Sequence, residues 1–413
     1  MKRWVGALLL VCPAGLSAQT KLVPIVNAQF LGGQSFFRSK NTAVTGNAAF
    51  QATPSVVFSE KSKLIPTLSS SYRGILTVEE LAGGGFLIQE IWDSFLTVKW
   101  ARQLGESAWS IKPKASGRLS FNNESKGENF GSGLFDYEKA SGGFEVERKG
   151  EKLTSQIFEA AYYDVRFPNY KALTSKQFGS EIKSGTKVLD FNALDGAYSF
   201  EWAMSQKTLS SLMLLGSFRN YPDQFIVNKT GVFETTKRKD TYLAGTASLR
   251  GVVGENLFDW RVRTIGGLAV SHARLGSNQN SFDATRTVFI DGYYDYRETS
   301  VSPSLSFLLN ENQRLGFSWT PARRKYPTRY AQDETGNHYN GVSGRIAEII
   351  NLRTQTYAAS YVWQFKETPW GKLSLIAQGA VRNARSNMRY EVAYRYNYNS
   401  ANYFTGLSWE FSR

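Results

Sequence analysis

The sequence predicts an all-β protein, a single antiparallel transmembrane β-barrel of about 16 strands, with about 14 as the alternative count. Three observations predict this fold. Segments in which apolar and polar residues alternate recur along most of the 413 residues. Short polar turns between these segments alternate with longer polar or Gly-rich stretches. Aromatic residues make up 14% of the chain. Beyond the N-terminus, however, no stretch approaches the ~18 consecutive apolar residues that a membrane-spanning helix needs.

The N-terminus has the pattern of a secretory signal peptide. A basic start at Met1-Lys2-Arg3 precedes an apolar core from Trp4 to Val11, and the small residues that end at Ala18 fit a cleavage site. The predicted organisation is a signal peptide over 1–18 and one barrel domain over 19–413. Cys12, the single cysteine of the chain, would leave with the signal. A disulfide framework and a thiolate metal site are therefore excluded for the mature protein.

The alternation assigns the side chains to two faces, because successive residues of a strand point to opposite sides. One face of the clearest segments is apolar and aromatic, as in Trp109, Ile111, Leu119 and Phe121, in Phe317 and Trp319, and in Trp363 and Phe365. The other face is polar or charged. The first face is expected to contact lipid and the second to line the lumen.

Turns and loops set the strand number. Tight turns are predicted at 59–62, 104–107, 148–151, 205–208, 253–256, 310–313 and 367–370. Longer loops are predicted at 77–89, 122–138, 167–188, 221–238, 275–285, 324–346 and 384–400. In bacterial barrels the short turns are periplasmic, the long loops are extracellular and the strand number is even. A first strand through Val26, Ala28 and Phe30 completes the even count.

The last segment of the chain resembles the terminal recognition signal of bacterial outer-membrane β-barrels. Gly406, Trp409 and Phe411 occupy the positions of that signal on an amphipathic strand. Two features depart from it, because Ser412 and Arg413 follow the last aromatic residue and Phe404 stands where a polar residue is usual. The resemblance covers nearly the whole mature chain but indicates a porin-like class and no specific family. It implies export to the Gram-negative outer membrane, contact with its lipid and glycolipid, and recognition of the last strand by the barrel-assembly machinery.

Signatures of catalysis are nearly absent. His272 and His338 are the two histidines, and neither has a poised nucleophile beside it in the sequence, as a Ser-His-Asp set would need. Asp291 and Asp295 could form a carboxylate cluster at the outer rim, but solvated carboxylates between tyrosines are the favoured interpretation. No phosphate loop, zinc-ligand spacing or dinucleotide fingerprint occurs. We therefore expect no enzyme, no cofactor and no metal site.

The charge is strongly basic, with a formal net value of +14. Nucleic acid is not expected as a partner of an exported barrel, which leaves two roles for the excess. The runs Arg323-Arg324-Lys325 with Arg329, and Lys237-Arg238-Lys239, could contact anionic glycolipid. The alternation also assigns cations to the lumen, of which the candidate pore-lining residues are Lys112, Lys114, Arg118, Arg261, Arg263, Arg314 and Arg382. These could be paired with inward acids in a solvated wall, the favoured interpretation, or could create a field that favours anions.

The expected function is a channel for small polar solutes, since about 16 strands enclose a lumen too wide for side chains to fill. An anion preference is expected if the pore is open, and the pair Lys112→Glu with Lys114→Glu should then shift selectivity toward cations. The alternative is a non-conducting barrel that serves docking or assembly, and an outer-membrane hydrolase is the least supported class. The barrel could also form a homo-oligomer.

Overall fold

The computed structural model of this chain describes residues 21–37, 44–74, 77–81, 84–88, 90–125, 128–150, 154–171, 186–255, 262–285, 287–338, 348–391 and 396–412. The predicted signal peptide, 1–18, lies outside these residues, as does Arg261. Every regular element that the structure describes is a β-strand. Within the described part of the chain, no helix is long and apolar enough to cross a membrane.

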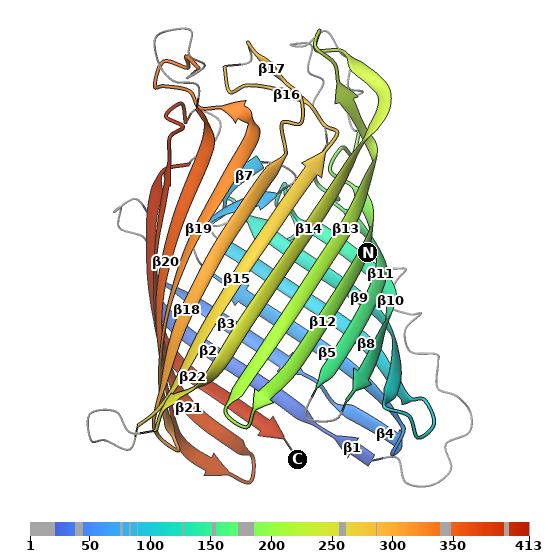
Figure 1. The fold of residues 1–413 in the computed structure, drawn as a ribbon, viewed down its shortest axis with the longest axis vertical. Helices are drawn as coiled ribbons and strands as arrows, with labels where there is room; N and C mark the ends of the chain where they lie inside the picture. Colours follow the sequence, from blue (N-terminus) through green and yellow to red (C-terminus); the bar gives the residue numbers. More distant parts are fainter. Residues whose placement is uncertain are drawn as a thin grey trace.

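One antiparallel sheet of 18 strands closes into a barrel (Figure 1). β1 (Lys21–Val23) and β4 (Ser55–Ser59) continue β2 and β3 across short breaks, so the barrel has 18 − 2 = 16 strands. These are β2 (Ile25–Phe37), β3 (Val44–Ala52), β5 (Ser62–Arg73), β8 (Glu90–Gln103), β9 (Trp109–Asn123), β10 (Tyr137–Lys149), β11 (Ser155–Arg166), β12 (Phe191–Ser205), β13 (Thr208–Val227), β14 (Phe233–Gly254), β15 (Arg263–Ser277), β18 (Tyr296–Asn310), β19 (Gln313–Tyr330), β20 (Ile349–Thr368), β21 (Gly371–Ser386) and β22 (Tyr398–Ser412).

The first and last strands close the barrel. β2 pairs with β22 from Ile25 opposite Ser412 to Phe37 opposite Ser400. The predicted fold, the count of about 16 strands and the first strand through Val26, Ala28 and Phe30 are therefore confirmed. Closure leaves no free sheet edge, as a strand-built membrane protein requires, because lipid offers no partner to an unpaired backbone group.

The predicted alternation of short turns and long loops is confirmed, although parts of the loops, such as 172–185, 339–347 and 392–395, lie outside the described residues. Two predicted loops need correction. The loop predicted at 324–346 begins with seven residues of β19, which continues to Tyr330. Residues 221–238 were predicted to be a loop, but β13 continues to Val227 and β14 begins at Phe233, so most of this stretch is a paired hairpin. Its polar composition hides the strands, because the outward residues of this hairpin are largely polar and its inward residues, such as Arg238, pack on other loops. A short hairpin, β6 (Thr77–Leu81) with β7 (Gly84–Ile88), lies within the predicted loop 77–89. A second, β16 (Ser281–Phe282) with β17 (Phe289–Ile290), begins in the predicted loop 275–285 and extends beyond it.

The outer face of the barrel is apolar, as the alternation predicts. Large side chains that remain exposed share one strand face, among them Leu268, Leu305, Phe317 and Trp363. Trp92 and Trp100 lie on this face of β8, and their indole N–H groups donate to the hydroxyls of Ser70 and Ser62, each at 3.0 Å. Amphipathic aromatic residues are typical of the interfaces of a membrane barrel.

Phe404, which departs from the terminal-strand pattern, has a structural role. Its side chain faces inward and is 2% exposed. It lies against Gly33, its partner on β2. A Cβ atom at position 33 would lie 2.8 Å from the Phe404 Cα atom and would also meet the Tyr403 carbonyl oxygen. Gly33 therefore provides the space that the ring fills, an arrangement in which an aromatic residue covers a glycine across two strands.

Candidate functional site: the barrel lumen

One side of the lumen is lined by small polar side chains. Strands β15 and β18 to β22 present serines, glycines and amides inward and enclose a cavity of about 490 Å³. Its polar lining includes Ser304, Ser306, Ser318, Ser360, Gln378 and Asn402. We call this side the polar wall. Arg250 and Arg314 also line the cavity, and the Arg314 guanidinium donates to the Ser306 hydroxyl at 3.2 Å.

The other side of the lumen carries ion pairs. Lys112 contacts the carboxylates of Glu145 and Glu147, the second at 2.8 Å, and Lys99 lies 2.6 Å from Glu145. The Glu145 carboxylate is thus shared by two lysines, and the residue is 5% exposed. We call the inward side of β8 to β11 the ionic wall. It has local charge balance, because cations and acids alternate across neighbouring strands.

The three strongest candidate pore-lining residues all belong to the ionic wall. Lys112 forms the pairs described above, and Lys114 contacts the Glu159 carboxylate. Arg118 donates to the Asp93 carboxylate through two guanidinium nitrogens, with Nε at 2.9 Å. The alternation assigned Asp93, Glu145, Glu147, Glu201 and Glu410 to the inward face but missed Glu159. Strand β11 hides it, since alanines and aromatic residues occur on both of its faces and the period is weak there.

The remaining candidates occupy different positions. Arg263 faces inward opposite Leu308. Arg382 faces inward, with its guanidinium carbon 5.7 Å from the centroid of the Tyr398 ring. Arg314 lines the cavity of the polar wall, whereas Arg261 lies outside the described residues. The structure therefore does not bring the seven candidates together into one ring.

Several inward cations were missed by sequence reasoning. Lys139 lies 3.4 Å from the centroid of the Tyr163 ring, and Arg219 lies 5.6 Å from that of Phe191. Arg250 and Lys63 also face inward, near the turn end of the barrel. A signal was present for three of them, because the apolar residues Leu64, Phe218 and Leu249 stand beside Lys63, Arg219 and Arg250 and therefore on the opposite strand face. Within the described residues, none of these four cations forms an ion pair with a carboxylate.

The loop end of the lumen is narrowed by apolar side chains. Phe135, Phe167 and Leu189 come from loops and pack on the inward residues Tyr163 and Val165. A second cluster joins Met388 and Tyr396 of the last loop to Tyr326 and Ile350, inward residues of β19 and β20. A third lies at Phe37, Ala384 and Tyr398. The loops thus fold against the inner wall as well as above it.

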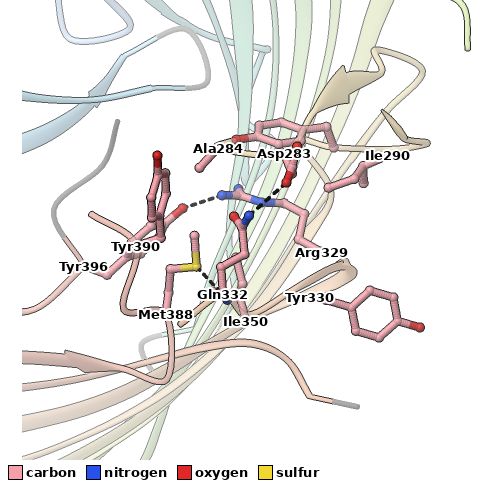
Figure 2. Close-up of a pocket in the computed structure, with 11 residues that line it drawn as sticks. Asp283, Ala284, Ile290, Arg329, Tyr330, Gln332, Ile350, Met388, Tyr390 and Tyr396 are labelled. Atoms are coloured by element: carbon pink, nitrogen blue, oxygen red, sulfur yellow. Dashed lines mark hydrogen bonds between the residues drawn. The ribbon is translucent and has the colours of Figure 1, made fainter. Parts of the chain in front are cut away.

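Figure 2 shows a small cavity within the second cluster. Its volume of about 10 Å³ is close to the minimum that one water molecule needs. The Arg329 guanidinium lies 4.2 Å from the Tyr293 ring and 4.5 Å from the Tyr326 ring, and it donates to the Tyr396 hydroxyl. Tyr330 points away from this group (Figure 2). The cavity is part of the packing between loops and is too small for a substrate.

His338 lies beside this cavity but is not paired with a nucleophile. Its Nε2 atom lies 2.8 Å from the Asp283 carboxylate, which also accepts from the Gln332 amide at 2.8 Å. Burial raises the pKa of the Asp283 carboxyl, but hydrogen bonds from Thr285, from the backbone amides of 287 and 288 and from His338 outweigh it, so this pKa is lowered. Asp283 therefore organises the loop as a carboxylate. Within the described residues, no hydroxyl group bonds to the His338 ring.

His272 and Asp295, which were also considered for catalysis, have hydrogen-bond partners of their own and form no hydrogen bond with His338. His272 faces outward near the loop end of β15, with Nδ1 2.9 Å from the Thr299 hydroxyl. Asp295 accepts a hydrogen bond from the Ser277 amide at 2.7 Å, and burial raises its pKa. In the part of the chain that the structure describes, no group of three or more His, Cys, Asp or Glu could hold a metal ion.

The candidate assembly signal lies on the closing strand. Trp409 donates its indole N–H to the Trp370 carbonyl oxygen at 2.8 Å, and its ring stacks on Phe411 with centroids 6.1 Å apart. Gly406 pairs with Leu31 of β2 on one side and with Ile376 of β21 on the other. The three residues thus lie at the seam where the barrel closes.

Several solved structures resemble this chain at low sequence identity. OmpT of Vibrio cholerae, folded in vitro, is 8% identical with a TM-score of 0.43, over 96% of this chain and 100% of that one. OccAB1 of Acinetobacter baumannii is 8% identical with a TM-score of 0.48, over 95% and 96%. A FadL homologue of Pseudomonas aeruginosa is 7% identical with a TM-score of 0.37, over 95% and 90%.

No family model and no curated protein matches the sequence. The closed strand barrel and its apolar outer face define the structural class, an outer-membrane β-barrel, which implies a location in the outer membrane. The likenesses to solved structures concern the fold alone.

Proposed function

We propose that the barrel is a porin-like channel for small polar solutes, with a preference for anions. The observation that carries this proposal is the open cavity of about 490 Å³ along the polar wall, which has exposed arginines at Arg250 and Arg314. Small hydroxyl and amide groups exchange hydrogen bonds with passing water and solutes without closing the path. The channel has no catalytic role in this proposal.

The anion preference rests on the cations that lack an acid partner. The pairs of Lys112, Lys114 and Arg118 largely cancel their own fields at a distance, because each is held close to a carboxylate. Arg250, Arg263 and Arg314 form no ion pair within the described residues. Their field therefore remains available to mobile ions within about a Debye length, roughly 10 Å at 0.1 M salt.

A planar-bilayer recording tests the channel. Purified full-length barrel in a lipid bilayer should give discrete conductance steps, and a salt gradient should give a reversal potential of the sign set by anion permeation. Cation selectivity would contradict the anion preference. A bilayer that stays silent, with protein proven to be folded and inserted, would contradict the channel itself.

A non-conducting barrel for docking or assembly is the second candidate, because three apolar clusters narrow the loop end. The same recording separates the two. In both cases we propose that the terminal strand is read by the barrel-assembly machinery and that the outer face contacts outer-membrane lipid.

A further inference from the structure

A row of cations crosses the outer face of the barrel near its loop end. We call it the basic rim, and it consists of Arg274 on β15, Arg297 on β18, Arg323 and Lys325 on β19, Arg353 on β20 and Arg385 on β21. All six side chains are exposed. Each shares a strand face with exposed apolar residues, such as Val270 with Arg274 and Val381 with Arg385. Because strand side chains alternate, the basic rim points away from the lumen.

The basic rim stands at a constant distance from the apolar band. On each of the five strands, one arginine lies four positions nearer the long loops than a large exposed apolar residue: Arg274 with Val270, Arg297 with Val301, Arg323 with Trp319, Arg353 with Tyr357 and Arg385 with Val381. Four residues of a strand tilted by about 40° span about 10 Å along the membrane normal. The charges thus lie at the level of outer-leaflet headgroups, since the long loops mark the extracellular side.

The strand register brings these like charges together. Arg297 lies opposite both Arg274 and Lys325, and Arg353 lies opposite both Arg323 and Arg385. Like charges directly opposite one another destabilise a sheet. A row of such pairs therefore carries a cost in the protein alone, and an anion placed between them would offset it.

The hydrogen bonds of the basic rim within the protein go to neutral groups. Arg323 donates to the Asn351 side-chain oxygen at 2.9 Å, and Arg385 donates to the carbonyl oxygens of Ala384 and Tyr398 at 2.9 and 3.4 Å. Among the described residues, none of the six cations forms an ion pair. The positive charge of Arg274 acts to lower the pKa of the Asp295 carboxyl, but the two groups do not form an ion pair. Most guanidinium N–H donors of the rim are left for an external acceptor.

We propose that the basic rim binds the phosphate groups of a phosphorylated glycolipid of the outer leaflet, with the acyl chains of that lipid on the apolar band below. Guanidinium groups bind phosphate through two parallel hydrogen bonds, which a row of arginines can repeat. From the loop end toward the middle of the barrel, the outer face presents first the basic rim and then the apolar band. A phosphorylated glycolipid has its phosphates and its acyl chains in the same order.

This assignment revises the cations expected to reach glycolipid. Arg324 turns inward and pairs with Glu298 at 2.6 Å, and Arg329 and Arg238 are buried among tyrosines. Arg323 and Lys325 remain on the outer face, and Lys237 and Lys239 of the second run are also exposed. The register adds cations from four strands other than β19.

The test compares two matched triple variants of the full-length barrel in detergent. Arg297→Gln with Arg323→Gln and Arg353→Gln removes half of the basic rim. Arg102→Gln with Arg148→Gln and Arg166→Gln removes three exposed arginines from the outer face elsewhere. Binding of bisphosphorylated lipid A, of its dephosphorylated form and of phosphatidylglycerol is measured by native mass spectrometry, and heat-modifiable electrophoretic migration confirms folding.

The rim triple should bind bisphosphorylated lipid A at least about tenfold more weakly than the unaltered protein, as expected for the loss of three charge-assisted contacts. The matched triple should bind it within about twofold of the unaltered protein, because Arg102 and Arg148 lie near the turn end of the barrel and Arg166 is paired with Asp164. Equal loss in both triples, or unchanged binding by the rim triple, would overturn the proposal. If the rim triple does not fold, the lipid preference of the unaltered protein tests the proposal by itself. It should prefer the phosphorylated lipid to the dephosphorylated form and to phosphatidylglycerol, and binding of either of these two lipids as tightly as the phosphorylated one refutes the assignment.

Discussion

At the scale of single residues, Arg238 shows how a loop charge becomes part of the packing. The residue is 1% exposed, and its guanidinium carbon lies 4.4 Å from the Tyr221 ring and 4.3 Å from the Tyr294 ring. The Asp240 carboxylate accepts two hydrogen bonds from it, at 2.9 and 2.6 Å. In the sequence it is one cation of a basic run, and its burial depends on tyrosines from other segments. No local pattern could reveal that.

Removing the acid partner should therefore loosen this hairpin. Asp240→Asn leaves a buried cation without its counter-charge, a change that costs about 3–5 kcal/mol in comparable buried pairs. We expect faster tryptic cleavage after Lys229, in the turn between β13 and β14. Asp164→Asn is the matched control, since Asp164 pairs with Arg166 at 2.8 Å on an exposed part of β11, and exposed pairs contribute about 0–1 kcal/mol. Equal cleavage rates in the two variants would contradict the buried-pair interpretation.

Asp283 should make one loop sensitive to acid. Its pKa is lowered below the ordinary value of 3.8. A carboxyl whose pKa is lower in the folded state stabilises that state above the ordinary pKa, and the contribution is lost as the pH falls through the lowered value. The amides of Thr287 and Val288, which donate to this carboxylate at 2.7 and 2.9 Å, should lose hydrogen-exchange protection below about pH 4.

Asp283→Asn gives the corresponding control, since it should remove most of that pH dependence while weakening protection at neutral pH. Retained pH dependence in the variant would assign the effect to another group of the loop.

At the scale of elements, the sequence was most informative where one face meets lipid. Alternation is a strong signal there, because Phe317 and Trp319 must face lipid while Arg314 must not. Local composition therefore predicted the barrel, its turns and the closing strand. It was least informative beyond the membrane, where the inward residues of the β13–β14 hairpin contact other loops and both faces can be polar. A different limit hid Glu159, the acid partner of Lys114, because alternation is weak on β11 and pairing across strands depends on register rather than on sequence distance.

The closing seam offers a test with two glycines on adjacent positions of the strand ladder. A Cβ atom at Gly406 would lie 2.8 Å from the Leu31 Cα atom and would also meet the Phe30 carbonyl oxygen, whereas a Cβ atom at Gly32 meets nothing within 4 Å. Gly406→Ala should therefore impair closure, and Gly32→Ala should not. The fraction of protein with heat-modifiable migration measures this. Equal yields would show that the seam relaxes around the added methyl group.

Deletion of 409–413 should abolish assembly more completely than either glycine variant. It removes the pairs of Trp409, Glu410, Phe411 and Ser412 with β2 and leaves the backbone of its first residues exposed to lipid. Insertion at normal levels would argue against closure by the terminal strand as a requirement for assembly.

At the scale of the whole molecule, charge is divided between the two sides of the lumen. The ionic wall holds cations and acids in contact, while the arginines of the polar wall stand without an acid partner in the described part of the chain. Lys112→Glu with Lys114→Glu, the pair that the sequence suggested, remains a valid prediction of a shift toward cations. It would also gather new carboxylates beside Glu145, Glu147 and Glu159, so altered packing could contribute to its effect.

A pair of double variants separates net charge from pairing. Arg250→Gln with Arg314→Gln removes two cations without an acid partner and should move the reversal potential toward cation permeation. Lys112→Gln with Glu145→Gln removes one charge of each sign and should leave the potential near that of the unaltered channel. Both effects should fade between about 0.1 and 1 M salt, because the Debye length falls from about 10 to about 3 Å. If the balanced variant shifts selectivity as much as the arginine variant, a local constriction at the ionic wall, rather than the arginines of the polar wall, selects the ion.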